Sequence, residues 1–307
     1  KLEESESSYK KAIELNPNYF EAYSNLGITL REMGKLEESE SSYKKAIELN
    51  PNYFEAYSNL GITLREMGKL EESESSYKKA IELNPNYAES YYNLGVTLRD
   101  LGRLKHSKDN YEKAITLKPN YSEAYNNLGV VFRELGMLDE SENSYKKAIK
   151  LNPDFADAYN NLSFTFLLKN DFENAYKFSE WRWKTRHNIG KKFITNKPLW
   201  NGESNKRVLT WKEQGIGDEI LYCSILSELK AISKKLIVNC DKRLIPLFKR
   251  SLSKDIVYKS DKKSILEEDY DNHIPIASIS KYFRKNLKSF ANTSNGYLKA
   301  DKQKTLR

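Results

Sequence analysis

Apolar residues recur with a fixed period of 34 residues along the first half of the chain. The 34 residues from Lys1 are repeated without change from Lys35, and later copies, beginning at Lys69, Arg103 and Met137, diverge from them. A period of this length indicates stacked repeats, in which each unit buries its apolar face against its neighbours. The pattern therefore predicts a solenoid in this half of the chain.

Each period reads as two helices. In the repeat 20–53, Tyr23 and the apolar residues after it share one helical face, and Gly34 suits the end of that helix. Tyr43 belongs to the apolar face of a second helix, which Pro51 stops because proline cannot continue the hydrogen-bond ladder. The same two-helix unit recurs at 54–87, 88–121 and 122–155.

These positions resemble the tetratricopeptide-repeat family, which implies an all-α, right-handed superhelix over residues 1–184. The matching residues are Tyr23, Leu26, Gly27, Tyr43, Ala46 and Pro51, with their equivalents in the next three repeats. One departure is systematic, because serine replaces the usual alanine early in the second helix, at Ser39, Ser73, Ser107 and Ser141. We expect its hydroxyl to bond back to the preceding turn. The array would comprise a half repeat and about five repeats, the last one degenerate, with Ser163 and Arg182 at positions where small residues pack.

One asparagine stands directly before the leucine in each first helix. These residues are Asn25, Asn59, Asn93, Asn127 and Asn161. An amide both donates and accepts hydrogen bonds, so a row of amides can bind an extended peptide backbone without requiring a particular sequence. The row resembles the asparagine ladder of O-linked N-acetylglucosamine transferase, which implies a protein or peptide partner in the groove of the repeats. The alternative is a merely solvated helix face.

The periodicity changes after residue 184. Residues 185–205 contain Gly190, Pro198 and Gly202 and are expected to be a linker. From 206 to 307, β-prone runs at 208–211, 236–238, 256–258 and 271–276 alternate with helical stretches at 220–233, 241–251 and up to residue 283. This alternation predicts an α/β domain with a parallel sheet.

A glycine loop follows the first expected strand. Gly215 and Gly217 would lie at the carboxyl end of that strand, where parallel sheets bind ligands, and would open a helix whose N-terminus favours negative charge. Ile220 stands where the longer dinucleotide-binding fingerprint would need another glycine. The loop by itself is therefore a weak sign of a substrate site.

The wider sequence resembles two-lobed glycosyltransferases of the GT-B type that are related to heptosyltransferases and preceded by tetratricopeptide repeats. The matching strings are 180–183 (EWRW), 198–202 (PLWNG), 213–220 (EQGIGDEI), 271–278 (DNHIPIAS) and 297–298 (YL). The resemblance implies a first, Rossmann-like lobe and the transfer of sugar from a nucleotide-sugar to a protein or glycan.

The same resemblance assigns roles to individual residues. Asp218 would be the base that removes a proton from the acceptor hydroxyl, provided that burial raises its pKa toward neutrality. The alternative is an acid that only stabilises the start of a helix. Glu213 and Gln214 would position the acceptor or merely orient the loop, and His273 is a further candidate for contacting the substrate.

In that family the second lobe binds the nucleotide-sugar, and Arg307 falls near the expected end of the first lobe. The chain therefore looks like a fragment at both ends, and we expect no cofactor or donor to bind to it alone. The alternative is a non-catalytic scaffold, to be separated from an enzyme by the behaviour of Asp218.

Charge divides unevenly, with a net of −5 over 1–170 and +13 over 171–307. Nucleic-acid binding is nevertheless the weaker interpretation, since the basic half shows no aromatic-and-basic recognition motif. Cys223 and Cys240 lack metal-ligand spacing, and the few histidines are scattered, so no metal site is expected. No run approaches the roughly 20 apolar residues of a membrane span. Because both cysteines stand in apolar contexts and are expected to be reduced, we expect a cytoplasmic protein.

Overall fold

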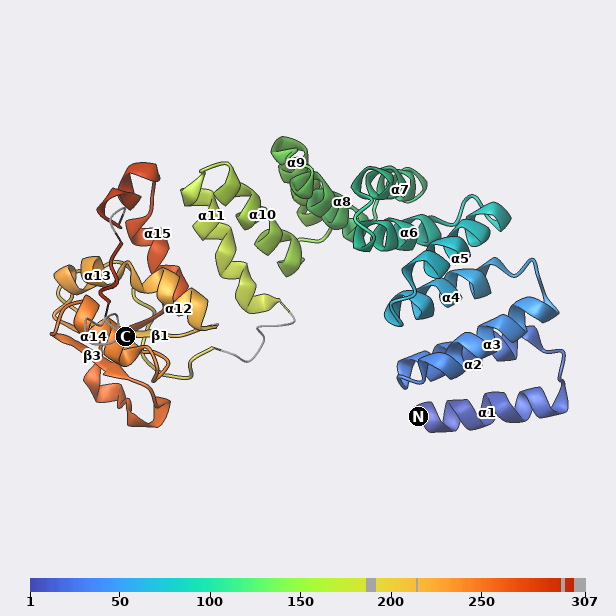
Figure 1. Ribbon diagram of the computed structural model, residues 1–307, viewed down its shortest axis with the longest axis horizontal. Helices are drawn as coiled ribbons and strands as arrows, with labels where there is room; N and C mark the ends of the chain where they lie inside the picture. Colours follow the sequence, from blue (N-terminus) through green and yellow to red (C-terminus); the bar gives the residue numbers. More distant parts are fainter. Residues whose placement is uncertain (186–191, 214, 294–295, 301–307) are drawn as a thin grey trace. The chain divides into compact units, whose positions relative to one another are not determined.

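The computed structural model describes residues 1–185, 192–213, 215–293 and 296–300. It divides into two compact units, Lys1–Ala158 and Tyr159–Arg307, which are described one at a time (Figure 1). The first contains α1 (Leu2–Leu15), α2 (Phe20–Glu32), α3 (Leu36–Leu49), α4 (Phe54–Glu66), α5 (Leu70–Leu83), α6 (Ala88–Asp100), α7 (Leu104–Leu117), α8 (Ser122–Glu134) and α9 (Leu138–Leu151). Helix α10 (Ala156–Leu168) crosses the boundary.

The helix pairs of the first unit end where the sequence predicts. Each first helix is followed by a glycine with φ between 72° and 78°: Gly34, Gly68, Gly102 and Gly136. Because side chains disfavour this left-handed conformation, glycine is needed at these turns. In the degenerate repeat Asn170 takes the equivalent place with φ 60°, which asparagine tolerates better than most residues.

A glycine and a tyrosine bring the two helices of each repeat together. A Cβ at Gly27 would lie 2.8 Å from the ring of Tyr43, which is fully buried. The hydroxyl of Ser39 donates to the backbone oxygen of Gly27 at 2.8 Å, and the equivalent serines of the next three repeats do the same. The expectation that these serines bond within their own helix is therefore wrong. The serine hydroxyl thereby ties the second helix of each repeat to the first.

We predict that Tyr43→Phe leaves the repeats at least as stable as before. Among the described residues the Tyr43 hydroxyl is buried without a hydrogen-bond partner, so its removal relieves a desolvation penalty of about 1 kcal/mol. The measurement is urea unfolding followed by circular dichroism. A loss of more than about 0.5 kcal/mol would show that the hydroxyl has a partner after all.

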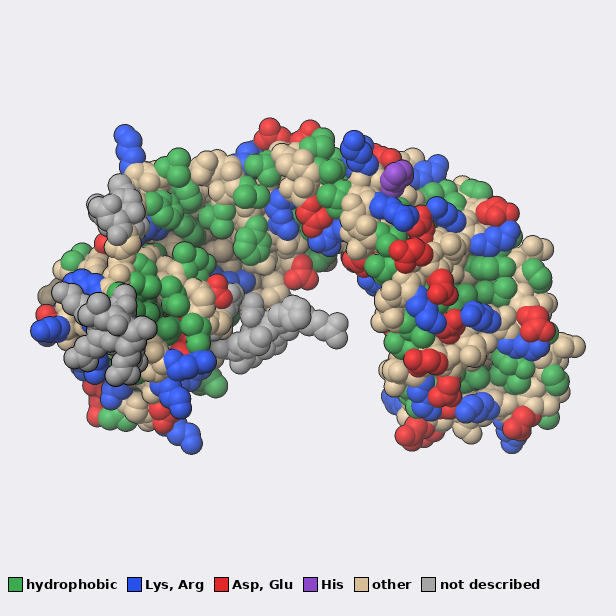
Figure 2. Space-filling model, in the orientation of Figure 1, with side chains coloured by type: hydrophobic (Ala, Val, Ile, Leu, Met, Phe, Trp, Pro, Cys, Tyr) green, Lys and Arg blue, Asp and Glu red, His purple; other side chains and the backbone are tan. Residues whose placement is uncertain are grey.

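Ion pairs join successive repeats along the second helices. The carboxylate of Glu40 accepts from Lys44 at 2.6 Å and from Lys69, in the next repeat, at 2.7 Å. These hydrogen bonds lower the pKa of Glu40. Glu6 and Glu74 make equivalent pairs at equivalent positions. Acidic and basic side chains are accordingly interspersed over this unit on the face shown in Figure 2.

The second unit contains two helical elements that precede a small sheet. Its elements are α11 (Phe172–Ser179), η1 (Glu180–Lys184), β1 (Arg207–Trp211), α12 (Ile216–Cys223), α13 (Leu226–Ile232), β2 (Lys235–Asn239), α14 (Ile245–Ser251), β3 (Ile256–Lys259), η2 (Lys262–Ser264), η3 (Glu267–Asp269), β4 (Asn272–Pro275), η4 (Ile276–Ile279), α15 (Ser280–Phe283) and η5 (Leu287–Thr293). The predicted single helix over 220–233 is wrong: two short helices replace it, and the first begins at Ile216.

The four strands form one parallel sheet in the order β3-β2-β1-β4. Val208 of β1 is opposite Leu236 of β2 and Asn272 of β4. All four strands fall where the sequence predicts them, since each is a short apolar run bounded by turn residues.

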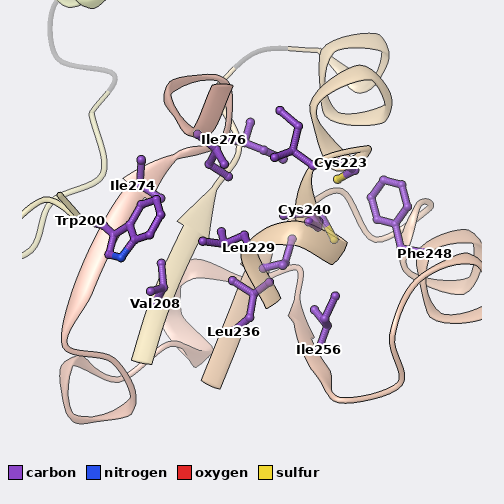
Figure 3. Close-up of a cluster of buried hydrophobic side chains, with 14 of the residues drawn as sticks. Trp200, Val208, Cys223, Leu229, Leu236, Cys240, Phe248, Ile256, Ile274 and Ile276 are labelled. Atoms are coloured by element: carbon purple, nitrogen blue, oxygen red, sulfur yellow. The ribbon is translucent and has the colours of Figure 1, made fainter. Parts of the chain in front are cut away.

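The two faces of the sheet are covered differently. One packs Val208 and Leu236 against α12, α13, α14 and η4, and Trp200 lies in the same cluster (Figure 3). The other packs Leu209 and Trp211 against side chains of η1 and of the loops: Trp183, Phe193, Ile265 and Tyr270. We call this second surface the loop-covered face. The structure thus shows a four-stranded parallel sheet with helices on one face, and the Rossmann-like lobe stays a prediction.

Part of the segment expected to be a linker lies against β4. Leu199 forms a parallel bridge with His273, and the N–H of Trp200 donates to the oxygen of His273 at 2.8 Å. Trp200 is only 2% exposed. Cys223 and Cys240 are free thiols in the same core, as expected, and burial raises the pKa of Cys240 to about 12.

Candidate functional site

The carboxyl end of β1 lies where the strand order changes direction. The chain runs outward from β1 to β2 and β3, and then returns to the other side of β1 to form β4. Parallel sheets bind ligands outside the carboxyl ends of their strands at such a switch point. The residues that follow β1 and β4 are therefore the place to look for a site.

Asp218 lies in the first turn of α12 with its side chain half-buried. Its backbone N–H donates to the oxygen of Gly215 at 3.1 Å, but its carboxylate does not cap the helix. Within the described part of the chain, that carboxylate has no hydrogen-bond or ion-pair partner. The carboxylate is thus not held by another side chain, and its place in the first turn also fits the alternative of an acid that stabilises the start of the helix.

The two glycines of this loop border open space. Within the described residues, a Cβ at Gly215 or Gly217 would meet no atom within 4 Å. Gly215 has φ −76°, which any residue adopts, so its backbone conformation does not require glycine. What the two glycines provide is an uncovered backbone at the start of α12. Gln214, the other predicted contact in this loop, lies outside the described residues.

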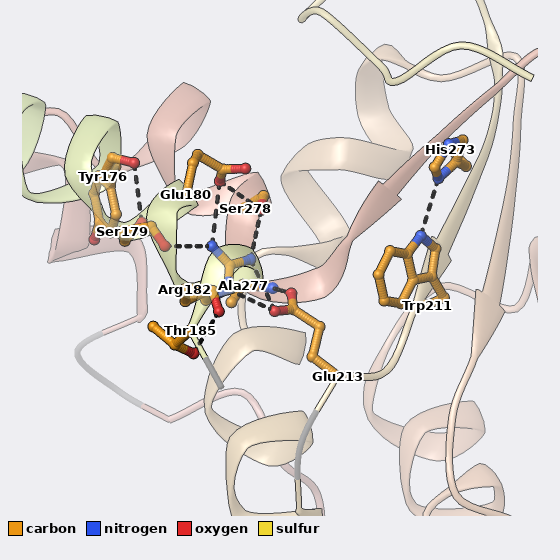
Figure 4. A network of polar contacts seen from close by, with 10 residues as sticks. All are labelled: Tyr176, Ser179, Glu180, Arg182, Thr185, Trp211, Glu213, His273, Ala277 and Ser278. Carbon is orange, nitrogen blue, oxygen red and sulfur yellow. Dashed lines mark hydrogen bonds and ion pairs between the residues drawn. The ribbon is translucent and has the colours of Figure 1, made fainter. Parts of the chain in front are cut away.

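A buried polar network surrounds Arg182 (Figure 4). Its guanidinium donates to Glu213 Oε2 at 2.8 Å and to the hydroxyl of Ser278 at 2.7 Å. Ser278 donates to Glu180 Oε1 at 2.7 Å, and Glu213 Oε1 accepts the N–H of Ala277 at 2.9 Å. The network therefore joins η1, the loop after β1 and the start of η4.

Glu213 and Arg182 form an internal ion pair. Their side chains are 3% and 9% exposed. Burial raises the pKa of Glu213, and the charge and hydrogen bonds of Arg182 oppose that shift. Because both carboxylate oxygens already have partners in the protein, the arrangement favours orientation of the loop over direct contact with an acceptor.

His273 lies on β4 beside the same strand end. Its Nδ1 accepts from Trp211 Nε1 at 3.1 Å, and the residue is 8% exposed. Burial lowers the pKa of His273, which keeps the ring neutral at neutral pH. The ring also makes a hydrogen bond to the backbone of Lys197, so both of its nitrogens have partners within the protein and His273, like Glu213, is placed to orient the strand end.

Two cavities adjoin on the loop-covered face of the sheet. The larger has about 700 Å³ and the smaller about 250 Å³, and both are lined by Lys192 and Phe193. Glu213 contributes to the larger and His273 to the smaller, whereas Asp218 lines neither. The structure thus brings Glu213 and His273 to neighbouring cavities and leaves Asp218 on the helix side of the loop.

Sequence reasoning missed the joint role of Arg182 and Ser278. Both fall in strings that resemble the glycosyltransferase family, but their contact joins residues 96 positions apart. The available signal was Arg182 itself, a charged residue at the place where each earlier repeat has a packing alanine.

The first four asparagines of the predicted row occupy equivalent positions on α2, α4, α6 and α8. Each of these helices contacts the next one in this series. Asn25 is exposed, and Asn59 and Asn93 are half-buried. In the part of the chain that the structure describes, these three amides have no hydrogen-bond partner. Asn127 differs, because its Nδ2 donates to the hydroxyl of Tyr92 at 3.1 Å.

Asn161, the last residue of the row, lies on α10 in the second unit.

Tyr92 explains why Asn127 differs from the earlier asparagines of the row. Its ring packs on Tyr121 at 4.9 Å, much as Phe54 packs on Tyr87 at 5.1 Å in the preceding repeat. The residue equivalent to Phe54 in this repeat is Ala88, which has no ring. The ring of Tyr92 takes its place against Tyr121. The uninterrupted part of the row is therefore Asn25, Asn59 and Asn93.

Comparison with protein families matches "Tetratricopeptide repeat" over residues 18–85, 52–120, 122–155 and 144–177, and "TPR repeat" over 1–34. Residues 1–177 are tetratricopeptide repeats. The resemblance seen in the sequence is confirmed for this TPR region. These matches stop short of the sheet, so the glycosyltransferase resemblance stays a prediction. A search of curated proteins finds no match.

Solved structures similar to the chain include YrrB, described as "a TPR protein with an unusual peptide-binding site", with 26% identity, 59% of this chain and 93% of that one covered, and a TM-score of 0.49. Pseudomonas aeruginosa pilF matches with 19% identity, 56% and 78% coverage, and a TM-score of 0.51. The Cut9–Hcn1 complex matches with 17% identity, 62% and 38% coverage, and a TM-score of 0.55. The last two share the fold of the TPR region.

The described residues contain neither a membrane-spanning helix nor a metal-binding group of side chains. None of the helices described is long and apolar enough to cross a membrane. Histidine, cysteine and carboxylate side chains form no group that could hold a metal ion in the described ranges.

Proposed function

We propose that the TPR region is a protein-interaction scaffold that holds an extended segment of its partner on the asparagine row. The observation that carries this proposal is the pair Asn59 and Asn93. Their amides occupy the same position on contacting helices and have no hydrogen-bond partner among the described residues. Each amide can pair with both the N–H and the C=O of a peptide backbone.

The test is binding of peptides selected from a random library displayed on phage. We expect Asn59→Ala combined with Asn93→Ala to weaken binding about tenfold or more, since each change removes hydrogen bonds to the peptide. The matched control is Asn52→Ala combined with Asn86→Ala, which changes the same residue type in the exposed turns of the same repeats. Equal affinities for both double variants would contradict the proposal.

We further propose that the α/β domain is the acceptor side of a GT-B-type glycosyltransferase, with the TPR region recruiting the protein on which the enzyme acts. The support is the glycine loop at the switch point of a parallel sheet, followed by Asp218, whose carboxylate has no partner among the described residues. The donor would be a nucleotide-sugar. A non-catalytic scaffold is the competing function, and transfer of radiolabelled sugar by the wild type and by Asp218→Asn separates the two.

A further inference from the structure

The larger cavity of the loop-covered face has an apolar floor and a basic rim. The half-buried side chains of Phe193 and Ile265 supply the floor and pack in the same cluster as Tyr270, which is only 1% exposed. Four lysines lie around them: Lys192, Lys212, Lys262 and Lys263. A volume of about 700 Å³ is that of a small-molecule site.

Positive charge is in excess on this rim within the described part of the protein. None of the four lysines has a carboxylate within ion-pair distance there. Of the two acids that line the cavity, Glu213 has a cationic partner, whereas Glu267 keeps its negative charge and offsets one of the four lysines. Glu213 pairs with Arg182, and Glu267 accepts from the Thr195 hydroxyl at 2.8 Å and from the Asn196 N–H at 2.7 Å.

We propose that this cavity binds a phosphate ester, with the phosphate among the lysines and the attached sugar or base against Phe193 and Ile265. A phosphate monoester carries nearly two negative charges at neutral pH, and lysine binds phosphate as a point charge. The half-buried ring of Phe193 offers an apolar surface to the rest of the ligand. The cavity also lies at the carboxyl end of β1, because Lys212 and Glu213 directly follow that strand.

This inference goes beyond the proposed sugar transfer and does not require Asp218 to act as a base, because ligand binding is measured without turnover. Two sources share the chemistry: a phosphorylated sugar on the acceptor side, or a nucleotide, whose binding would overturn the expectation that no donor binds to this chain alone. Calorimetric titration with glucose 1-phosphate, UDP and inorganic pyrophosphate distinguishes them. We expect at least one of the two organic phosphates to bind more tightly than pyrophosphate, because pyrophosphate has nothing to place on the apolar floor.

The variant that tests the site is Lys262→Gln combined with Lys263→Gln, which we expect to weaken binding about tenfold or more. The matched control is Lys249→Gln combined with Lys254→Gln, two exposed lysines of the same domain that line neither cavity. The control should stay within about twofold of the wild type, a change of less than 1 kcal/mol.

Three results would overturn the proposal. One is the absence of binding by all three phosphates. Another is equal weakening by the test and control variants, which would reduce the lysines to diffuse surface charge. The third is binding of heparin or DNA with the same dependence on Lys262 and Lys263, which would assign the basic rim to a nucleic-acid or polyanion surface.

Discussion

Replacing Arg182 by methionine is expected to destabilise the second unit by about 3–5 kcal/mol, because it leaves a buried carboxylate without its cation. The carboxylate is that of Glu213, whose side chain is 3% exposed. The change also removes the donor that holds the Ser278 hydroxyl. The three segments joined by the network would then lose their shared anchor.

The loss should depend on pH in a definite direction. Burial already raises the pKa of Glu213, and the charge of Arg182 opposes that shift. Without the arginine, the folded-state pKa of Glu213 lies further above its unfolded value. The variant then keeps its stability at pH values below the unfolded-state pKa of Glu213. It loses stability as the pH rises through the folded-state pKa. Arg182→Met should therefore be closer to the wild type near about pH 5 than near about pH 8.

Tryptophan fluorescence during urea unfolding measures this effect selectively. All four tryptophans, Trp181, Trp183, Trp200 and Trp211, lie in the second unit. The control is Arg182→Met combined with Glu213→Gln, which removes the unpaired charge and should recover part of the loss. A single variant as stable as the wild type at all pH values would show that the pair does not anchor the domain.

Asp218→Asn is expected to reduce sugar transfer by about 10²–10⁴-fold while leaving the fold unchanged. Asparagine keeps the shape of the side chain but cannot accept the proton of an acceptor hydroxyl. The Asp218 carboxylate has no hydrogen-bond or ion-pair partner among the described residues, so the only structural contribution lost is its favourable charge in the first turn of α12. The measurement is the rate of radiolabel transfer from a nucleotide-sugar, with unfolding curves recorded in parallel.

The matched control is Asp255→Asn, an exposed acid of the same domain that lines neither cavity. Transfer that is equally fast in the wild type, Asp218→Asn and Asp255→Asn would remove Asp218 from the mechanism. An absence of transfer by the wild type with every donor and acceptor tried would favour the non-catalytic scaffold.

Local patterns predicted most of the fold because the elements depend on short-range signals. The 34-residue period placed each helix pair, and Gly34 and its equivalents marked the helix ends through their positive φ. The four strands were equally visible as short apolar runs. The break between α12 and α13 was missed, since 220–233 keeps helical spacing across Ser224 and only tertiary packing decides that the helix stops.

The site was predicted less completely because its contacts join distant segments. Glu213 and His273 were identified from the sequence, but the partner of each came from elsewhere in the chain, Arg182 for one and Trp211 for the other. The role of Ser39 was missed for the same reason, since its hydroxyl crosses to Gly27 in the neighbouring helix. Lys262 and Phe193 reach one cavity only through folding, and neither stands in a motif.

The most direct test of the central claim is to observe the side-chain amides of the asparagine row during peptide binding. In nuclear magnetic resonance spectra of ¹⁵N-labelled protein, the side-chain NH₂ signals of Asn59 and Asn93 are assigned as those that disappear in Asn59→Ala and Asn93→Ala. On addition of a selected peptide, we expect both signals to shift, while those of Asn52 and Asn86 stay in place. Unchanged Asn59 and Asn93 signals with a saturated peptide complex would contradict the account and place the partner on another surface of the repeats.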